Sequence, residues 1–238
     1  MSVRSNAIGL AAGVLAASAV SAAAFECHTA LVLGLDASRS VDAGEHRLQR
    51  EGLAAALMDP IIMDAIAPYE GLGVVAMAFE WSNPGDQVVI APWTVLDGPA
   101  AIEAFAGSIL SGPSIERRWR TGIGAAMRFA ADQVKKAPAD CRRRVVDISG
   151  DGPGNAGTPP EVHRRAGVLD GLTINGLVIR HPEFDSAQPP DKDPLRYFTE
   201  HVVQGPGAFI EVTSSYQDYP EAILRKLLRE LSPAVAQR

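Results

Sequence analysis

Short apolar runs alternate with stretches of helical period along the chain, and this alternation constrains the fold more than any other feature. It is typical of a parallel sheet with helices on both of its faces. Strands are expected at residues 30–35, 72–79, 87–96, 145–149, 172–179 and 208–212. Helices are expected from about 41, over 99–110, from 121, over 161–169, over about 195–203 and around 223–231.

The link between the second and third expected strands is the turn-rich run Ser82-Asn83-Pro84-Gly85-Asp86. So short a link cannot hold a crossover helix, so these two strands should form an antiparallel hairpin. Asp42 and Glu45 match the capping-box pattern at the start of the first helix. The prediction is an α/β fold, doubly wound, with a mainly parallel six-stranded sheet that has one antiparallel edge strand.

The amino-terminal segment has the pattern of a secretory signal peptide. Residues 1–24 contain one charge, Arg4, then a small and apolar run over 7–20, then Ser21-Ala22-Ala23-Ala24. Cleavage near Ala24 would leave one domain, residues 25–238, in the periplasm or outside the cell, with no membrane span. An uncleaved anchor is the alternative, although the run is short against the roughly 20 residues that span a bilayer.

Composition and charge exclude several classes of partner. A net charge of −6, which becomes −7 when Arg4 is removed, disfavours nucleic acid and anionic membrane surfaces. The histidines lack the spacing of zinc ligands and are interpreted as surface or edge residues. They are His28, His46, His163, His181 and His201.

A candidate metal site begins where the first expected strand ends. The run Asp36-Ala37-Ser38-Arg39-Ser40 has an oxygen-bearing side chain at every second residue, which places all three on one side of an extended chain. Such oxygens suit magnesium, manganese or calcium. The alternative is a loop whose Asp and Ser side chains bond only to nearby backbone.

Two further elements should lie at the same edge of the sheet. Thr121-Gly122 stands at the entrance to a helix, and Ser149-Gly150-Asp151-Gly152-Pro153 follows a buried strand. In open α/β sheets, ligands bind outside the carboxyl ends of the strands.

Taken together, these residues resemble the metal-ion-dependent adhesion site of von Willebrand factor A domains. The resemblance covers nearly all of the mature chain and extends to a family of secreted bacterial proteins that carry this domain. It implies one bound divalent cation, for which Mg²⁺ is the first candidate and Mn²⁺ and Ca²⁺ are the alternatives. Ser38 and Ser40 would bind the ion directly, while Asp36, Thr121 and Asp151 would act directly or through water. One coordination position would stay open for an acidic group of an unknown protein or other ligand.

The resemblance also implies the strand order 3-2-1-4-5-6, in which the strands before Asp36 and Asp151 are neighbours. Cys27 and Cys141 would then lie together at the amino-terminal ends of these two strands, opposite the candidate site. We therefore expect a disulfide between them in an exported protein.

Three more residues are expected near the site, as a rim that contacts the ligand: Glu80, Trp81 and Trp119. The alternative is that the two rings cap the edge of the core. Asp147, inside a buried strand, is expected to make a structural hydrogen bond.

The leading hypothesis is a metal-dependent binding module without catalytic activity. A metal-assisted hydrolase is the first alternative, with Ser38 or Ser40 as nucleophile, but the chain has no G-x-S-x-G motif and no histidine placed by motif as a base. The second alternative is a structural domain whose metal site is not functional.

Overall fold

The computed structural model describes residues 26–67, 72–116, 119–180, 189 and 192–231; the expected signal peptide lies outside them. One six-stranded sheet has the order β3-β2-β1-β4-β5-β6. Only the β2–β3 pair is antiparallel among these strands, so the predicted fold class is confirmed. The strands are β1 Glu26–Asp36, β2 Leu72–Trp81, β3 Gln87–Val95, β4 Cys141–Gly150, β5 Thr173–Ile179 and β6 Ile210–Thr213.

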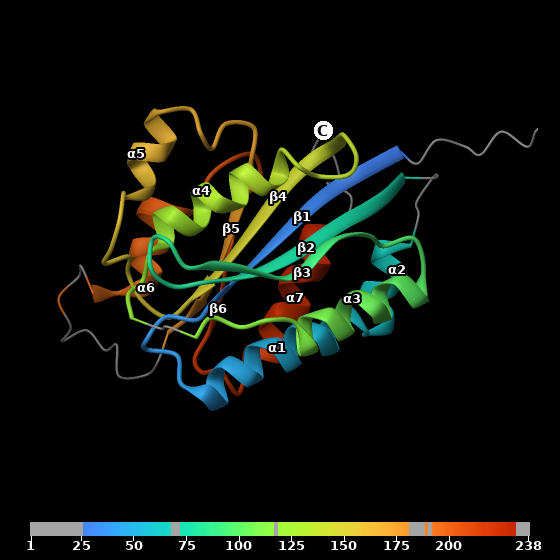
Figure 1. Ribbon diagram of the computed structural model, residues 1–238, viewed down its shortest axis with the longest axis horizontal. Coiled ribbons are helices and arrows are strands. Elements are labelled where there is room, and N and C mark those ends of the chain that lie inside the picture. Colours follow the sequence, from blue (N-terminus) through green and yellow to red (C-terminus); the bar gives the residue numbers. More distant parts are fainter. Residues whose placement is uncertain (1–25, 68–71, 117–118, 181–188, 190–191, 232–238) are drawn as a thin grey trace, which may run out of the picture.

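Helices cover both faces of the sheet (Figure 1). On one face lie α1, α2, α3 and α7, and on the other lie α4, α5 and α6, which continues as the π-helix η2. Their bounds are α1 Ala43–Leu57, α2 Pro60–Ile66, α3 Pro99–Ser111, α4 Ile123–Val134, α5 Pro160–Arg165, α6 Pro194–Tyr197, η2 Phe198–Val202 and α7 Tyr219–Leu231.

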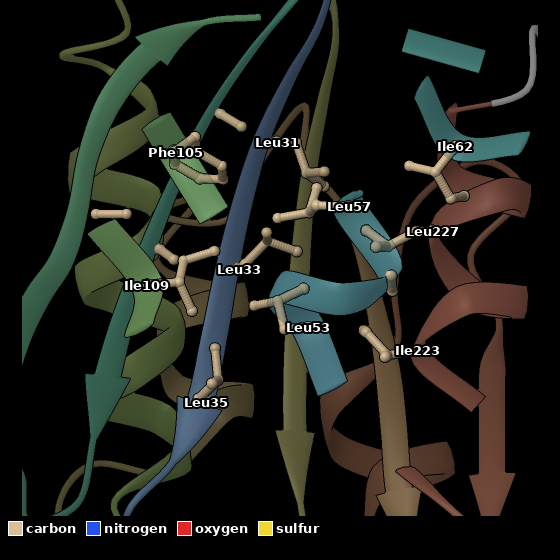
Figure 2. Close-up of a cluster of buried hydrophobic side chains, with 14 of the residues drawn as sticks. Leu31, Leu33, Leu35, Leu53, Leu57, Ile62, Phe105, Ile109, Ile223 and Leu227 are labelled. Carbon is tan, nitrogen blue, oxygen red and sulfur yellow. The ribbon is translucent and has the colours of Figure 1, made fainter. Parts of the chain in front are cut away.

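The central strand β1 contributes to both halves of the core because its side chains alternate between the two faces. Leu31, Leu33 and Leu35 point toward α1, α3 and α7, as Figure 2 shows, while Val32 packs on the opposite side among residues of α4 and β4. A strand buried on both faces must be continuously apolar, and this burial fixes β1 at the middle of the sheet.

Several boundaries differ from the sequence prediction. β1 and β4 begin earlier than expected, at Glu26 and Cys141, because β1 pairs with β4 from Cys27 onward and with β2 from Glu26 onward. The short helix α2 was not predicted, although Asp59 caps it and Pro60 occupies its first position. The Pro- and Asp-rich segment 181–194, whose composition is typical of a loop, lies mostly outside the described residues.

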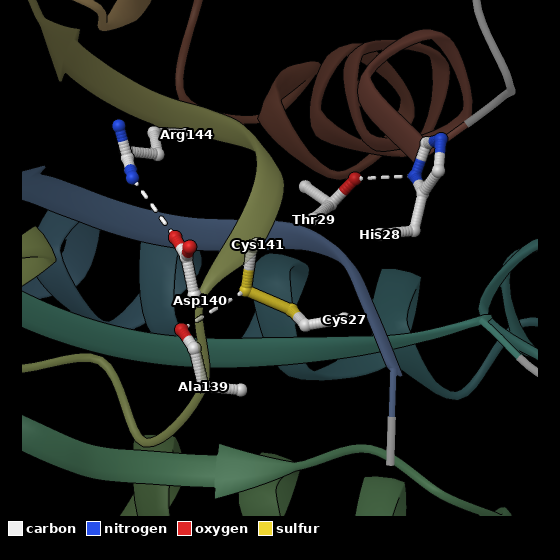
Figure 3. The surroundings of a disulfide bond; sticks show 7 residues. All are labelled: Cys27, His28, Thr29, Ala139, Asp140, Cys141 and Arg144. Carbon is white, nitrogen blue, oxygen red and sulfur yellow. Dashed lines mark hydrogen bonds and ion pairs between the residues drawn. A yellow bond between two sulfur atoms is a disulfide. The ribbon is translucent and has the colours of Figure 1, made fainter. Parts of the chain in front are cut away.

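Cys27 and Cys141 form the expected disulfide (Figure 3). They face each other directly in the β1–β4 register, with their Cα atoms 4.5 Å apart. The bond therefore joins the amino-terminal ends of two parallel strands whose carboxyl ends lead into Asp36 and Asp151.

Asp147 lies in a buried ionic cluster, consistent with the structural role expected for it. Lys226 on α7 contacts Asp147 at 2.7 Å and Glu230 at 2.6 Å, and Asn175 donates a hydrogen bond to Glu230. Burial raises the pKa of Asp147 to about 7, and the charge of Lys226 opposes that rise.

Among the helices that the structure describes, none combines the length and the apolar character needed to cross a membrane.

Candidate functional site

The first loop of the site is held by backbone contacts at the end of β1. The N–H of Ala37 donates to the carbonyl of Trp81 at 2.9 Å, which keeps the chain beside β2 for one more residue. The N–H of Ser38 donates to Asp36 Oδ1 at 2.6 Å, a local turn that fixes the carboxylate. Asp42 then caps α1 in the predicted capping box.

Three oxygen-bearing side chains from two loops meet at this edge of the sheet. The hydroxyls of Ser38 and Ser40 lie 3.2 Å apart, and Ser40 donates a hydrogen bond to Asp151 Oδ1 at 2.7 Å. A Cβ added at Gly150 would stand 3.3 Å from Asp36 Oδ2, so a glycine at the end of β4 lets the loop that bears Asp151 approach Asp36 closely.

Asp36 is the most electrostatically unusual of these residues. It is fully buried, and its Oδ2 has no hydrogen-bond partner within the described chain. Burial first, and then the negative charge of Asp151, raise the pKa of Asp36 well above its ordinary value, while hydrogen bonds from Ser38 and from the backbone of Asp151 act in the other direction. Two neighbouring carboxylates with an unpaired oxygen suit a cation that would take the place of the missing hydrogen bond and reduce the repulsion.

Thr121 is bonded to Asn155, in the loop that follows Asp151. The amide oxygen of Asn155 accepts a hydrogen bond from the Thr121 N–H at 3.0 Å, and its Nδ2 donates to the Thr121 hydroxyl at 3.3 Å. The N–H of Asn155 also donates to the Thr121 carbonyl at 2.9 Å. The loop that follows Asp151 therefore positions Thr121, a role for Asn155 that the sequence prediction missed.

The donor set consists mainly of hydroxyls, not of a cluster of classical metal ligands. No group of three or more His, Cys, Asp or Glu side chains in the described part of the chain is arranged to hold a metal ion. A cation at this edge would therefore depend on Ser38, Ser40 and Thr121 in addition to the two carboxylates.

Two more buried side chains support the site and were not predicted. Gln49 on α1 donates from its Nε2 to the backbone carbonyl of Asp36 at 2.9 Å. Burial first, and then the charges of Asp151 and Asp36, raise the pKa of Tyr216 well above its ordinary value. Tyr216 follows the carboxyl end of β6. Its position after a strand end, where ligands bind in open α/β sheets, was the one sequence signal that pointed to it.

The prediction that Glu80 lies on an exposed rim is wrong. Its exposed fraction is 0%, and it accepts hydrogen bonds from His46 at 2.5 Å and Arg50 at 2.7 Å. Ser114 and the N–H of Ile115 bond to its other oxygen. Although burial opposes ionisation, hydrogen bonding and positive charge at His46 and Arg50, with the Ile115 N–H, hold the pKa of Glu80 at about 2. His46, interpreted as a surface residue, is buried for the same reason.

Trp81 is also not part of a rim. Its exposed fraction is 0%, and its ring lies under Gly150, where an added Cβ would contact it at 3.5 Å. The alternative that this ring closes the edge of the core is therefore correct. Trp119 differs, because 62% of it is exposed while its N–H reaches the hydroxyl of Ser82 at 3.4 Å.

Comparison of the sequence with protein-family models gives one match, described as "Protein of unknown function (DUF1194)", over residues 26–235. The chain belongs to the DUF1194 family. The match covers all of the described residues. No curated protein matches the sequence significantly.

Solved structures show that this DUF1194 chain has the von Willebrand factor A fold. A von Willebrand factor type A protein from Catenulispora acidiphila is similar, with a TM-score of 0.59 at 14% identity over 86% of this chain and 43% of that one. Proximal thread matrix protein 1 from the mussel byssus, solved with a zinc-occupied MIDAS (metal-ion-dependent adhesion site) motif, has a TM-score of 0.57 at 15% identity. The match covers 87% of this chain and 48% of that one. The pilus adhesin SpaC from Lactobacillus rhamnosus GG has a TM-score of 0.57 at 14% identity, over 86% of this chain and 30% of that one. The chain thus spans less than half the length of these proteins.

Proposed function

We propose that this DUF1194 protein is an exported, metal-dependent binding module that recognises an acidic group of a partner and has no catalytic activity. The observation that carries the proposal is the buried, unpaired Oδ2 of Asp36 beside Asp151 and the hydroxyls of Ser38 and Ser40. Similar structures described as a pilus adhesin and as a matrix protein with a metal-occupied motif support a binding role.

Asp36, Ser38, Ser40, Thr121 and Asp151 would hold one divalent cation, with Mg²⁺ as the first candidate. When bound, the ion supplies an electrophilic coordination position for a carboxylate of the partner. The two carboxylates roughly neutralise a divalent charge, while the hydroxyls add no charge and preserve its attraction for an anion. Asn155 and Gln49 keep the loops in place, so little backbone ordering would accompany binding.

Trp119 is the residue we assign to direct contact with the partner beside the ion. Its ring is 62% exposed and lies two residues before Thr121. A large exposed aromatic side chain next to a polar site is typical of binding surfaces. Replacement by Ala should weaken partner binding without changing metal affinity.

Calorimetric titration of the purified protein with Mg²⁺ and Mn²⁺ tests the proposal. The parent should bind one ion, and Asp36→Ala should abolish binding because it removes the buried carboxylate. Asp64→Ala is the matched control, since Asp64 is an exposed acid on α2, outside the site. Equal metal affinity of the parent and Asp36→Ala would contradict the proposal, as would a parent that binds neither ion.

Export is proposed from the signal-like segment 1–24, and the Cys27–Cys141 disulfide supports it, because such bonds persist in oxidising compartments. Fractionation of cells that express the full chain should recover it from the periplasm or medium with an amino terminus near residue 25. Recovery of the unprocessed chain from the cytosol would contradict export.

A further inference from the structure

A pocket of about 550 Å³ lies beside the loop that carries Asp151, at the end of the sheet where α6 lies in Figure 1. This volume is within the range of small-ligand sites, about 300–1,000 Å³. Loop 153–155 forms one wall, and residues of α6 and η2 with Lys192 form the other. The side chains that line the second wall are Lys192, Arg196, Tyr197, Glu200 and His201.

Asn155 connects this pocket to the candidate metal site. It lines the pocket, and the same side chain holds both the N–H and the hydroxyl of Thr121. Among the described residues, Asn155 is therefore the one side chain that both lines the pocket and holds a residue of the candidate metal site.

Positive charge predominates in the pocket, although the whole chain has a net charge of −6. Glu200 is its one acid, and the Nε of Arg196 already binds that carboxylate at 2.7 Å. This leaves the terminal guanidinium nitrogens of Arg196 and the exposed ammonium of Lys192, which has no ion-pair partner among the described residues. Arg donors arranged in a planar fork match a carboxylate well.

The exposed cations extend to the loops of the metal site. Arg39 stands between Ser38 and Ser40, and Arg120 precedes Thr121. Both are exposed, and neither side chain has an acidic partner in the described ranges. Asp42 and Glu45, the two acids that follow Arg39 in sequence, are engaged in the capping box of α1, and Asp36, which precedes it, is buried. The surface around the site thus offers several unpaired cations to one ligand.

We infer that this pocket is a second anion subsite, and that the ligand of the protein is a polycarboxylate which places one carboxylate at the metal site and another against Arg196 and Lys192. The inference rests on the proposed function and narrows its ligand class. A monocarboxylate would fill only one of the two subsites. Two carboxylates on one molecule would bind more tightly because the second contact is intramolecular.

The experiment compares three probes on the full mature chain with saturating Mg²⁺: acetate, glutarate and the peptide triglutamate. Binding is followed by calorimetry and by the amide NMR signals of Gly154, Asn155 and Arg196. Triglutamate or glutarate should bind at least about tenfold more tightly than acetate, and only they should shift these signals. Preference for glutarate would identify a small-molecule ligand, and preference for triglutamate would identify an acidic peptide; either supports the inference.

Two variants test the cations directly. Lys192→Glu should weaken binding of the preferred probe about fivefold, and Arg196→Gln about tenfold, with no change for acetate or for Mg²⁺. Lys136→Glu is the matched control, because Lys136 is also exposed but follows the far end of α4. It should bind all three probes as the parent does.

Equal affinity of Lys192→Glu, Arg196→Gln and parent for glutarate and triglutamate would overturn the second subsite and leave the proposed function standing. So would equal affinity of the three probes for the parent. Binding of the probes that persists in chelator, and is lost in Arg196→Gln, would instead support the pocket while contradicting a metal-dependent function.

Discussion

Ser40 donates a 2.7 Å hydrogen bond to Oδ1 of Asp151, which joins the loop after β1 to the loop after β4. The bond gives one oxygen of the Asp151 carboxylate a neutral donor, and the negative charge of Asp151 raises the pKa of Asp36. Asp36, fully buried nearby, has an oxygen with no partner in the described chain. The two loops are therefore held together against the repulsion of their own acids.

Asp36→Asn tests this repulsion. In chelator the variant should have a free energy of unfolding about 1–2 kcal/mol higher than that of the parent, because it removes a buried ionisable group that Asp151 repels and keeps the shape. Adding Mg²⁺ should stabilise the parent by about 2.7 kcal/mol at one hundred times the Kd and leave the variant unchanged. Urea unfolding with and without the ion gives both values, with Asp64→Asn as control. Equal stabilisation of both proteins by Mg²⁺ would refute this account.

Removing the disulfide should lower stability without affecting the metal site. The bond closes a loop of 114 residues, so Cys27→Ser with Cys141→Ser should cost about 4–5 kcal/mol in the chain-entropy model. Metal affinity should stay within about twofold of the parent's, because the bond lies at the opposite end of β1 and β4 from the candidate metal site. Urea unfolding and calorimetry measure the two effects. Alkylation of the unreduced, unfolded parent provides the control, and a modified cysteine there would disprove the bond.

The ionic cluster around Asp147 predicts a pH dependence of stability. The carboxyl has a pKa of about 7 in the folded protein and about 3.9 in an unfolded chain, so between these values the folded protein binds a proton that the unfolded chain has released. Its contribution to stability is therefore complete below about pH 4 and is lost as the pH rises through about 7.

Asp147→Asn should remove this contribution. The variant should gain stability relative to the parent as the pH rises from about 4 to about 7, by at most about 1.4 kcal/mol per pH unit. Urea unfolding across this pH range measures the difference in free energy of unfolding between the variant and the parent. Contributions from other titrating groups are the same in both proteins and cancel in this difference. A constant difference between the two proteins would show that Asp147 does not titrate there.

Two glycines in helices should respond oppositely to alanine. A Cβ at Gly124, in the first turn of α4, would overlap the backbone carbonyl of Thr158, so Gly124→Ala should destabilise the protein by about 1–3 kcal/mol. A Cβ at Gly107, in α3, meets nothing within 4 Å. Gly107→Ala should stabilise the protein by about 0.5–1 kcal/mol, since alanine is the better helix former. Thermal unfolding compares them, and a stabilising Gly124→Ala would be inconsistent with the packing described.

The fold was predictable because its signals are local or periodic. The resemblance to von Willebrand factor A domains implied the strand order that places β1 near the centre, and the short link after Trp81 identified the antiparallel edge strand. The helix α2 was missed because seven residues are too few for a periodic pattern, even though Asp59 and Pro60 mark its start.

The candidate site was predictable only where its residues follow strand ends. Asp36 and Asp151 do so, and the structure brings their loops together. Glu80 also ends a strand, but its burial depends on Arg50 and His46, which lie 30 and 34 residues away in the sequence. A strand end shows where a side chain is placed, and it does not show which distant partners will cover it.

The direction of the strands also determines which face of the domain points into solution when the protein is immobilised on a surface. Glu26 begins β1 beside the disulfide, and the carbonyl of Glu230, near the end of α7, accepts a hydrogen bond from Arg143 near the start of β4, so both lie at the opposite end of the strands from Asp36. A protein immobilised on a sensor chip through that end of the strands would direct the loops of the candidate metal site into the flowing solution. Attachment through an engineered cysteine at Arg39 would instead press those loops against the surface, and the two orientations offer a simple way to map the binding face.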